Sequence, residues 1–193
     1  MPATTSHSWL RDERTEAAAE RILDAAARLF VDHGVTATGM ADIASAAGCS
    51  RATLYRYFEN RKALHLAFVH REARRLGERV ARSVTATDPR ERITEAVLTA
   101  IREVRADPTL SVWFGLGDAA LASELASTSE MIEVLGATFL AGPGGGVDAE
   151  TTGRARWLVR GIVSLLTVPG VDEDDERAMI EQFLVPVVGP ARL

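Results

Sequence analysis

Residues 40–64 read MADIASAAGCSRATLYRYFENRKAL, and this stretch predicts two short helices joined by a tight turn. Gly48 lacks a Cβ atom and can take the left-handed backbone conformation that closes the first helix. Ser50 is a residue type that caps a helix N-terminus, because its hydroxyl accepts a backbone N–H bond. Each helix then presents a narrow apolar stripe, which consists of Ile43 and Ala47 in the first and of Leu54 and Phe58 in the second.

Longer helices are predicted on both sides of this stretch. Apolar residues recur at helical spacing over residues 14–33, and Gly34 follows as a C-terminal stop. A second long helix is predicted from about residue 61 past residue 80, until the segment TATDP ends it near Pro89. The first of these helices can cover the apolar stripes of the two short ones, which predicts a three-helix module at the N-terminal end.

The rest of the chain also has helical spacing, and no run of alternating residues indicates a strand. We therefore expect an all-α fold. Further helices are predicted over residues 89–106, 108–114, 118–140 (as one helix or two), 148–166 and 172–188.

The composition is that of a globular protein, with 193 residues of which 47% are hydrophobic and 25% charged. No apolar run approaches the ~18–20 residues that cross a bilayer, and the first residues lack the apolar segment of a secretory signal, so we expect a cytoplasmic protein. A single cysteine excludes an internal disulfide and a cysteine-based zinc site.

The net charge of −5 is unevenly distributed along the chain. Residues 1–82 hold 13 Arg/Lys and 10 Asp/Glu, a balance of +3, whereas residues 83–193 hold 9 and 17, a balance of −8. A mildly basic N-terminal module on an acidic body is compatible with an anionic partner for the module alone.

The second short helix carries the side chains that suggest what this partner is. At ~1.5 Å per residue it would be roughly 12–13 Å long, which is comparable with the ~12 Å width of the DNA major groove. Residues 49–62 hold both tyrosines and the only lysine of the chain, together with three arginines. Arginine can donate two hydrogen bonds to guanine, and tyrosine hydroxyls can reach phosphate oxygens. The helix is therefore predicted to dock on double-stranded DNA.

The same residues resemble the helix-turn-helix of TetR-type transcriptional repressors over roughly residues 14–64. The matching apolar, turn, cap and aromatic positions are Ile43-Ala44, Ala47-Gly48, Ser50, Leu54-Tyr55, Tyr57-Phe58 and Leu64. The chain departs from the family pattern at Cys49, where valine is usual, at Gly39, where threonine or serine is usual, and at Arg61, where lysine is usual. Arginine keeps the charge and has a wider donor fork, so we expect the contact with the DNA backbone to persist.

The resemblance implies an N-terminal three-helix DNA-binding module followed by a larger α-helical body for ligand binding and dimerisation. It divides the chain into a flexible N-terminal arm (1–13), a helix-turn-helix DNA-binding domain (14–60), a connecting helix (61–84) and an effector-binding and dimerisation domain (85–193). Base contacts are expected from Arg51, Ala52, Thr53 and Arg56. Phosphate contacts are expected from Thr38, Ser50, Tyr55, Tyr57, Arg61 and Lys62. The alternative for Tyr55 or Arg56 is that the side chain only covers apolar surface.

The predicted helix over residues 148–166 is apolar nearly all round from Trp157 to Leu166, so burying one face would leave another in water. The resemblance implies a homodimer formed by the last two long helices. Its interface is expected to include Leu158, Gly161, Ile162, Leu165, Phe183 and Val187. The alternative is a helix fully buried in its own core.

The resemblance also implies a pocket for a small apolar effector in the body. The expected lining residues are Trp113, Phe114, Leu116, Met131, Leu135, Phe139 and Trp157, and the alternative for each is plain core. The acidic run DEDDE at 172–176 could hold a metal, but capping and the helix dipole explain acidic residues at a helix start, so we expect no metal and no cofactor.

An enzyme is not expected. The segment GPGGG lacks the Lys and Ser/Thr of a phosphate-binding loop, and the four histidines have no partners in motif spacing. The resemblance implies a homodimeric repressor that a small apolar ligand releases from a pseudo-palindromic operator. The alternatives are an activator, or an orphan or nucleoid-type DNA binder without an effector; a membrane- or protein-interaction module lacks a basic amphipathic face and an anchor.

Overall fold

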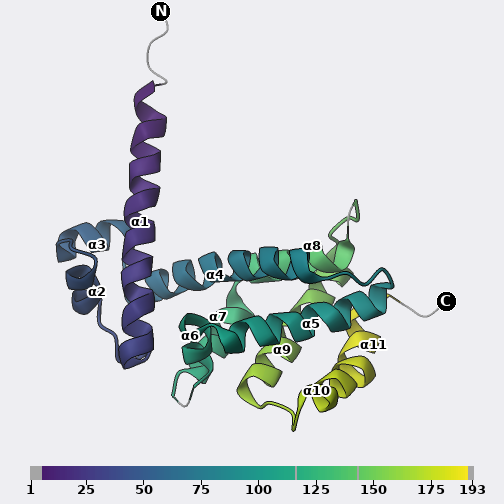
Figure 1. The fold of residues 1–193 in the computed structure, drawn as a ribbon. Coiled ribbons are helices and arrows are strands. Elements are labelled where there is room, and N and C mark those ends of the chain that lie inside the picture. Colours follow the sequence, from purple (N-terminus) through teal and green to yellow (C-terminus); the bar gives the residue numbers. More distant parts are fainter. Residues whose placement is uncertain (1–5, 116, 143, 191–193) are drawn as a thin grey trace, which may run out of the picture. The chain divides into compact units, whose positions relative to one another are not determined.

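The computed structural model describes residues 6–115, 117–142 and 144–190, with residues 6–14 described by their backbone alone. Over these ranges the chain forms helices and turns and no strand, which confirms the all-α prediction. Figure 1 shows the helices in chain order from purple to yellow. They group into two compact units, of which the first ends at Phe68 and the second begins at Val69. This boundary lies inside the helix that the sequence predicts as the connection.

The first unit is built around one long helix, with two short helices packed together on one side of it (Figure 1). Its core contains Phe30, Leu54 and Phe68, none of them more than 1% exposed. The rings of Phe30 and Phe68 meet edge to face with their centroids 5.3 Å apart. The helices are α1 (Ser6–His33), α2 (Met40–Ala46), α3 (Arg51–Tyr57) and the first turns of α4 (Arg61–Ser83).

Helix α1 begins at Ser6, eight residues before the predicted start near Arg14. Residues 6–13 contain neither glycine nor proline, so nothing in the sequence interrupts the helix there. The arm predicted for residues 1–13 therefore overlaps α1, and residues 1–5 lie outside the described residues.

Glycines and a capping serine determine other ends of these helices, as the sequence predicts. Gly34 and Gly48 have φ angles of 85° and 67°, in the left-handed region that favours glycine. The hydroxyl of Ser50 accepts a hydrogen bond from the backbone N–H of Thr53 at 3.0 Å and caps α3. The turn and the cap that the sequence predicts are thus confirmed.

The second unit packs α9 against α7 and α8, and α5 against α9 and the C-terminal helices. The stretch 118–140 forms two helices, one of the two predicted possibilities. The main apolar cluster consists of Ile93, Val97, Leu98, Ile101, Leu158, Ile180, Val185 and Val188. The elements after α4 are α5 (Pro89–Ala106), α6 (Pro108–Ser111), the 3₁₀ helix η1 (Val112–Phe114), α7 (Ala119–Thr128), α8 (Glu130–Ala141), α9 (Ala149–Thr167), α10 (Glu173–Met179), the π-helix η2 (Ile180–Leu184) and α11 (Val185–Val188).

The C-terminal helix predicted as one element over residues 172–188 changes its winding near its end. The π-helical turns of η2 separate α10 from α11. Pro186 lies in α11, and in a regular α-helix a proline ring clashes with the carbonyl group four residues earlier, which here belongs to residue 182 inside η2. The wider π turn accommodates the proline without ending the helix.

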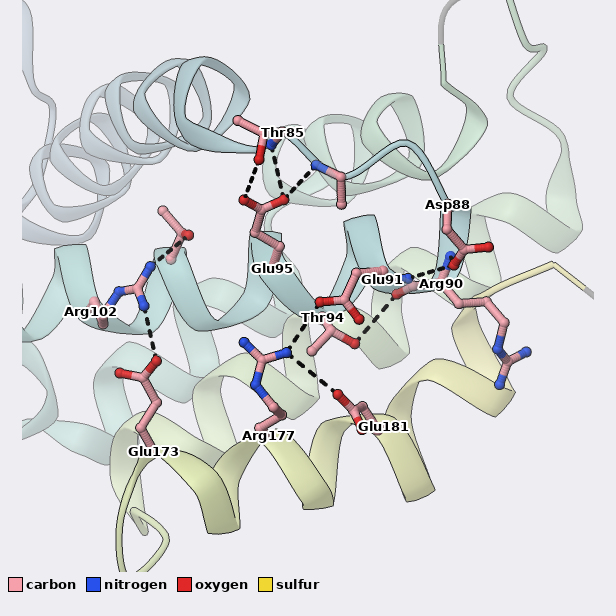
Figure 2. A network of polar contacts seen from close by, with 12 residues as sticks. Thr85, Asp88, Arg90, Glu91, Thr94, Glu95, Arg102, Glu173, Arg177 and Glu181 are labelled. Carbon is pink, nitrogen blue, oxygen red and sulfur yellow. Dashed lines mark hydrogen bonds and ion pairs between the residues drawn. The ribbon is translucent and has the colours of Figure 1, made fainter.

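A network of polar contacts fixes α5 in the second unit (Figure 2). The carboxylate of Glu95 accepts bonds from the backbone N–H groups of Thr85 and Ala86, at 2.9 and 2.8 Å. The Ala86 bond, followed by those from Thr85, holds the pKa of Glu95 below its ordinary value. Arg102 on the same helix bonds Glu173 of α10 at 3.0 Å. These contacts tie the end of α4 and the start of α10 to α5.

The acidic run at 172–176 is used for capping and ion pairing. The carboxylate of Asp172 accepts a bond from the Asp175 N–H at 2.9 Å and caps α10, which confirms the capping prediction. Glu176 is 2% exposed and accepts bonds from both terminal nitrogens of Arg105, at 2.9 and 2.6 Å. None of the described helices is both long and apolar enough to cross a membrane.

Candidate nucleic-acid interface

Helix α3 is fastened to the first unit by its apolar stripe. Leu54 is completely buried and Phe58, its C-cap residue, is 7% exposed. The side chains at the remaining positions are left on the flanks and the outer face of the helix. Arg51, Ala52, Tyr55 and Arg56 are exposed, whereas Thr53 and Tyr57 are half-buried.

A cationic and an aromatic side chain of α3 contact each other. The guanidinium carbon of Arg56 lies 5.4 Å from the centroid of the Tyr57 ring, which stacks the charged group on an aromatic face. Tyr55, on the same helix, is 48% exposed. Stacking restricts the arginine side chain, so less freedom is lost when it binds a base or a phosphate.

The Ser50 and Thr53 hydroxyl groups at the start of α3 bond each other. Their oxygens lie 2.9 Å apart, and Ser50 also accepts the backbone bond that caps the helix. Each hydroxyl has one donor hydrogen and their mutual bond uses one of the two, so one donor hydrogen is left for a phosphate oxygen. Of the two, Ser50 is exposed and Thr53 half-buried.

Two of the predicted phosphate contacts are engaged within the protein. Thr38 is 2% exposed, and its hydroxyl lies 2.8 Å from the carbonyl oxygen of Gly34. The Nη2 atom of Arg61 donates to the carbonyl oxygens of Val35 and Thr36, at 2.7 and 2.5 Å. The structure therefore places both side chains at the turn between α1 and α2, and Thr38 away from the surface.

The sequence interpretation missed Asn60, which determines where α4 starts. Its side-chain oxygen accepts a bond from the backbone N–H of Ala63 at 2.9 Å, as an N-cap does. This cap fixes the first turn of α4, from which Arg61 and the exposed Lys62 project. The signal was present, because asparagine directly before a helix is a preferred cap.

The predicted effector-pocket residues lie in different surroundings in the second unit. Trp113 is 3% exposed and Trp157 is 56% exposed. Phe139 packs on the core, and the guanidinium carbon of Arg92 lies 4.7 Å from its ring centroid. Phe114, Met131 and Leu135 are half-buried, and Leu116 lies outside the described residues. A small depression has a different, largely polar lining of Ala126, Ser127, Ser129, Glu133, Arg156, Val159 and Arg160.

The predicted interface residues divide between core and surface. Leu158 belongs to the core of its own unit and is 5% exposed, whereas its neighbour Trp157 is an exposed large apolar residue of α9. Ile162 and Leu165 are half-buried against the same core. A Cβ atom on Gly161 would lie 2.9 Å from the methyl groups of Leu184, so glycine allows a close approach there.

The exposed apolar residues at the C-terminal end form a stripe. Phe183 and Val187 are 72% and 54% exposed, and Met179, which the sequence interpretation missed, is 42% exposed. The four-residue spacing of Met179, Phe183 and Val187 was a signal for one helical face. We call these three residues the C-terminal stripe.

Two short helices at a tight turn, the second with basic and aromatic side chains on its outer face, define a helix-turn-helix regulator that binds DNA. Residues 22–68 match the family described as bacterial regulatory proteins of the tetR family. The chain is also 50% identical over 184 residues to an uncharacterized HTH-type transcriptional regulator of Mycobacterium tuberculosis, a match that covers 95% of this chain and 91% of that relative. The chain belongs to the tetR family and is a transcriptional regulator, not an enzyme.

Two further proteins are similar to this chain. The HTH-type transcriptional repressor LfrR of Mycolicibacterium smegmatis is 32% identical over an alignment of 130 positions that covers 58% of this chain and 64% of LfrR. The crystal structure of RolR in complex with its ligand resorcinol aligns with a TM-score of 0.67 and 20% identity over 92% of this chain and 90% of RolR. At that identity, the second similarity concerns the fold alone.

Proposed function

We propose that the protein is a homodimeric repressor that places one α3 helix per subunit into successive major grooves of a pseudo-palindromic operator. The observation that carries this proposal is the pairing of a buried Leu54 with an exposed, cationic and aromatic outer face on one short helix. Two such helices related by twofold symmetry would read half-sites about one helical turn (~34 Å) or a multiple apart.

The roles on α3 divide between bases and phosphates. Arg51 and Arg56 can fork onto base edges, with Ala52 and Thr53 beside them for apolar and hydroxyl contacts. Phosphate contacts are proposed for Ser50, Tyr55, Tyr57 and Lys62, which lie on the flanks of α3 and at the start of α4. The Arg56 guanidinium lies over the Tyr57 ring, so the two proposed contacts would be made side by side.

The proposed dimer uses the C-terminal stripe together with Trp157 of α9. Exposed apolar side chains at regular helical spacing are costly in water and are covered in a subunit interface. Gly161, Ile162 and Leu165 of α9 are half-buried and are also proposed as interface residues. A two-helix face of this kind is self-complementary in a twofold dimer.

A small apolar effector in the second unit is proposed to release the operator. It would shift α4 and change the separation of the two α3 helices. Two rigid DNA-binding units fit both half-sites at one separation only, so this change would weaken operator binding. The naming of LfrR as a repressor and the binding of resorcinol by RolR support this role by analogy. The alternative is a regulator without an apolar effector.

Arg56→Ala and Tyr57→Phe test the proposed division of roles. The first should relax the base preference at one position of the operator, at a loss of about 1–3 kcal/mol for the preferred base. The second removes one hydroxyl but keeps the ring under Arg56, so it should weaken binding to all sequences alike. The operator is first obtained by selection from random DNA, and affinities are measured by fluorescence anisotropy. Equal behaviour of the two variants would refute the division.

A further inference from the structure

The turn between α1 and α2 is held by polar side chains from three parts of the first unit. Its backbone runs from Gly34, whose N–H donates to the carbonyl of Phe30 at 2.9 Å, to Gly39, whose N–H donates to the carboxylate of Asp42 at 3.2 Å. Between them Val35 is completely buried. The turn thus ends α1 and starts α2 within a few residues, and its shape sets the direction in which α2 leaves.

The carbonyl groups of this turn are bonded by two side chains that the sequence predicts as DNA contacts. The hydroxyl of Thr38 lies 2.8 Å from the carbonyl oxygen of Gly34 and 3.2 Å from that of Leu29. Arg61 reaches back 25 and 26 residues from the first turn of α4 to the carbonyls of Thr36 and Val35. Consecutive carbonyls are bridged by one guanidinium nitrogen, which carries two N–H donors.

We propose that Arg61, assisted by Thr38, is a positioning residue for DNA recognition and not a contact to phosphate. It fastens the start of α4 to the turn before α2, and α2 in turn packs against α1 and carries α3. The proposal rests on the proposed DNA-binding function and assigns to Arg61 a role inside the first unit. Lys62, the next residue, is exposed and is the cation that this part of α4 presents to a phosphate.

Arginine suits this role better than the lysine that the family pattern has at the same position. Its planar fork presents fixed donors, whereas a lysine ammonium is a point charge on a flexible stem. A guanidinium that already donates to two carbonyl groups has its donors aligned with the turn, and turning it toward a phosphate would break those bonds. Breaking the partly buried bond to the carbonyl of Val35 costs stability.

The experiment compares Arg61→Gln with Lys62→Gln in the full-length protein. Both variants lose one positive charge on the same turn. Operator affinity is measured at several salt concentrations, and amide hydrogen exchange is measured at Gly34 and Gly39. Arg61→Gln should leave the slope of log K against log [salt] close to the wild-type slope, speed exchange at the two glycines about tenfold and lower Tm by about 4 °C. Lys62→Gln should make this negative slope shallower by about 0.9, as the loss of one phosphate contact does, and leave exchange unchanged.

Two results would overturn the proposal. One is a salt slope for Arg61→Gln that becomes as shallow as that of Lys62→Gln. The other is exchange at Gly34 and Gly39 that stays at the wild-type rate. Should Arg61→Gln be too unstable for binding measurements, Arg61→Lys decides, because it keeps the charge: a phosphate contact would retain wild-type affinity, whereas a positioning role would not. A wild-type protein that binds no DNA would refute the proposed function, while exchange and Tm would still test the role of Arg61 in the turn.

Discussion

Glu176 is an acidic residue at the start of α10 whose charge is enclosed by donors. Its side chain is 3% exposed, and it accepts bonds from Arg105 and from the backbone N–H of Gly170 at 3.0 Å. The hydrogen bonds and charge of Arg105 hold the pKa of Glu176 below its ordinary value, although burial acts in the opposite direction. The ionised form is therefore the one that the folded state stabilises.

Glu176→Gln should lower the free energy of unfolding by about 2 kcal/mol, because it leaves Arg105 without its charged partner. Chemical denaturation measures the loss. Glu173→Gln is the matched control, since its ion pair with Arg102 is about half exposed and should contribute less than about 1 kcal/mol. Equal losses in the two variants would contradict the importance of burial at Glu176.

The contribution of Glu176 should also depend on pH in a defined direction. Since its pKa is lowered in the folded state, the contribution is complete above the ordinary value of 4.5 and is lost as the pH falls through the lowered value. The stability difference between wild type and Glu176→Gln should therefore shrink on acidification below about pH 4.5. Denaturation curves at pH 7, 4.5 and 3 measure it, and a difference that grows toward acid would contradict the assignment.

At the scale of elements, two glycines on α9 occupy contrasting surroundings. A Cβ on Gly161 would come within 2.9 Å of Leu184 in η2, whereas a Cβ on Gly153 would meet nothing within 4 Å. Gly153→Ala should therefore raise the free energy of unfolding by about 0.5–1 kcal/mol through helix propensity alone. Gly161→Ala should gain less than Gly153→Ala, because the methyl groups of Leu184 must move. Thermal denaturation of the two variants measures both changes, and equal gains would show that Leu184 does not restrict position 161.

The elements that the sequence predicted well are those that local signals define. Gly48 and Ser50 determine the turn and the cap of the helix-turn-helix within a few residues, and both predictions are confirmed. The start of α1 at Ser6 and the π turn before Pro186 were not predicted, since the apolar spacing was followed only from residue 14 and the sequence pattern treated the second as an ordinary helix.

Contacts between distant residues were harder to predict than helices. The bond from Arg61 to Val35 spans 26 residues, and a motif match cannot tell whether a cation donates inward or outward. Because apolar residues lie nearly all round α9, their spacing does not indicate which face of the helix is buried. The sequence therefore could not distinguish the buried Leu158 from the exposed Trp157. The predicted DNA contacts on α3 remain a prediction, and five of the eight residues from 50 to 57 are exposed (Ser50, Arg51, Ala52, Tyr55 and Arg56).

At the scale of the whole molecule, the proposed dimer depends on the C-terminal stripe. Phe183→Asp places a charge at its most exposed ring and should convert the protein to a monomer with a large loss of operator affinity, because half-sites are then bound singly. Light scattering at micromolar concentration measures the mass. Val171→Asp is the control, since Val171 is 92% exposed but lies between α9 and α10 and outside the stripe. A wild-type protein that is monomeric would refute the interface.

The contacts of the first turns of α4 within the first unit have a consequence for chimeric regulators. In such chimeras the DNA-binding unit of one relative is joined to the second unit of another. A crossover at the loop before Arg61 looks natural in the sequence, but it would exchange Arg61 and Phe68 while keeping the turn and the ring of Phe30 that they contact. A crossover after Phe68, inside α4, transfers the whole first unit, including the turns of α4 that pack in it. Functional chimeras should therefore be sought with their joints within α4.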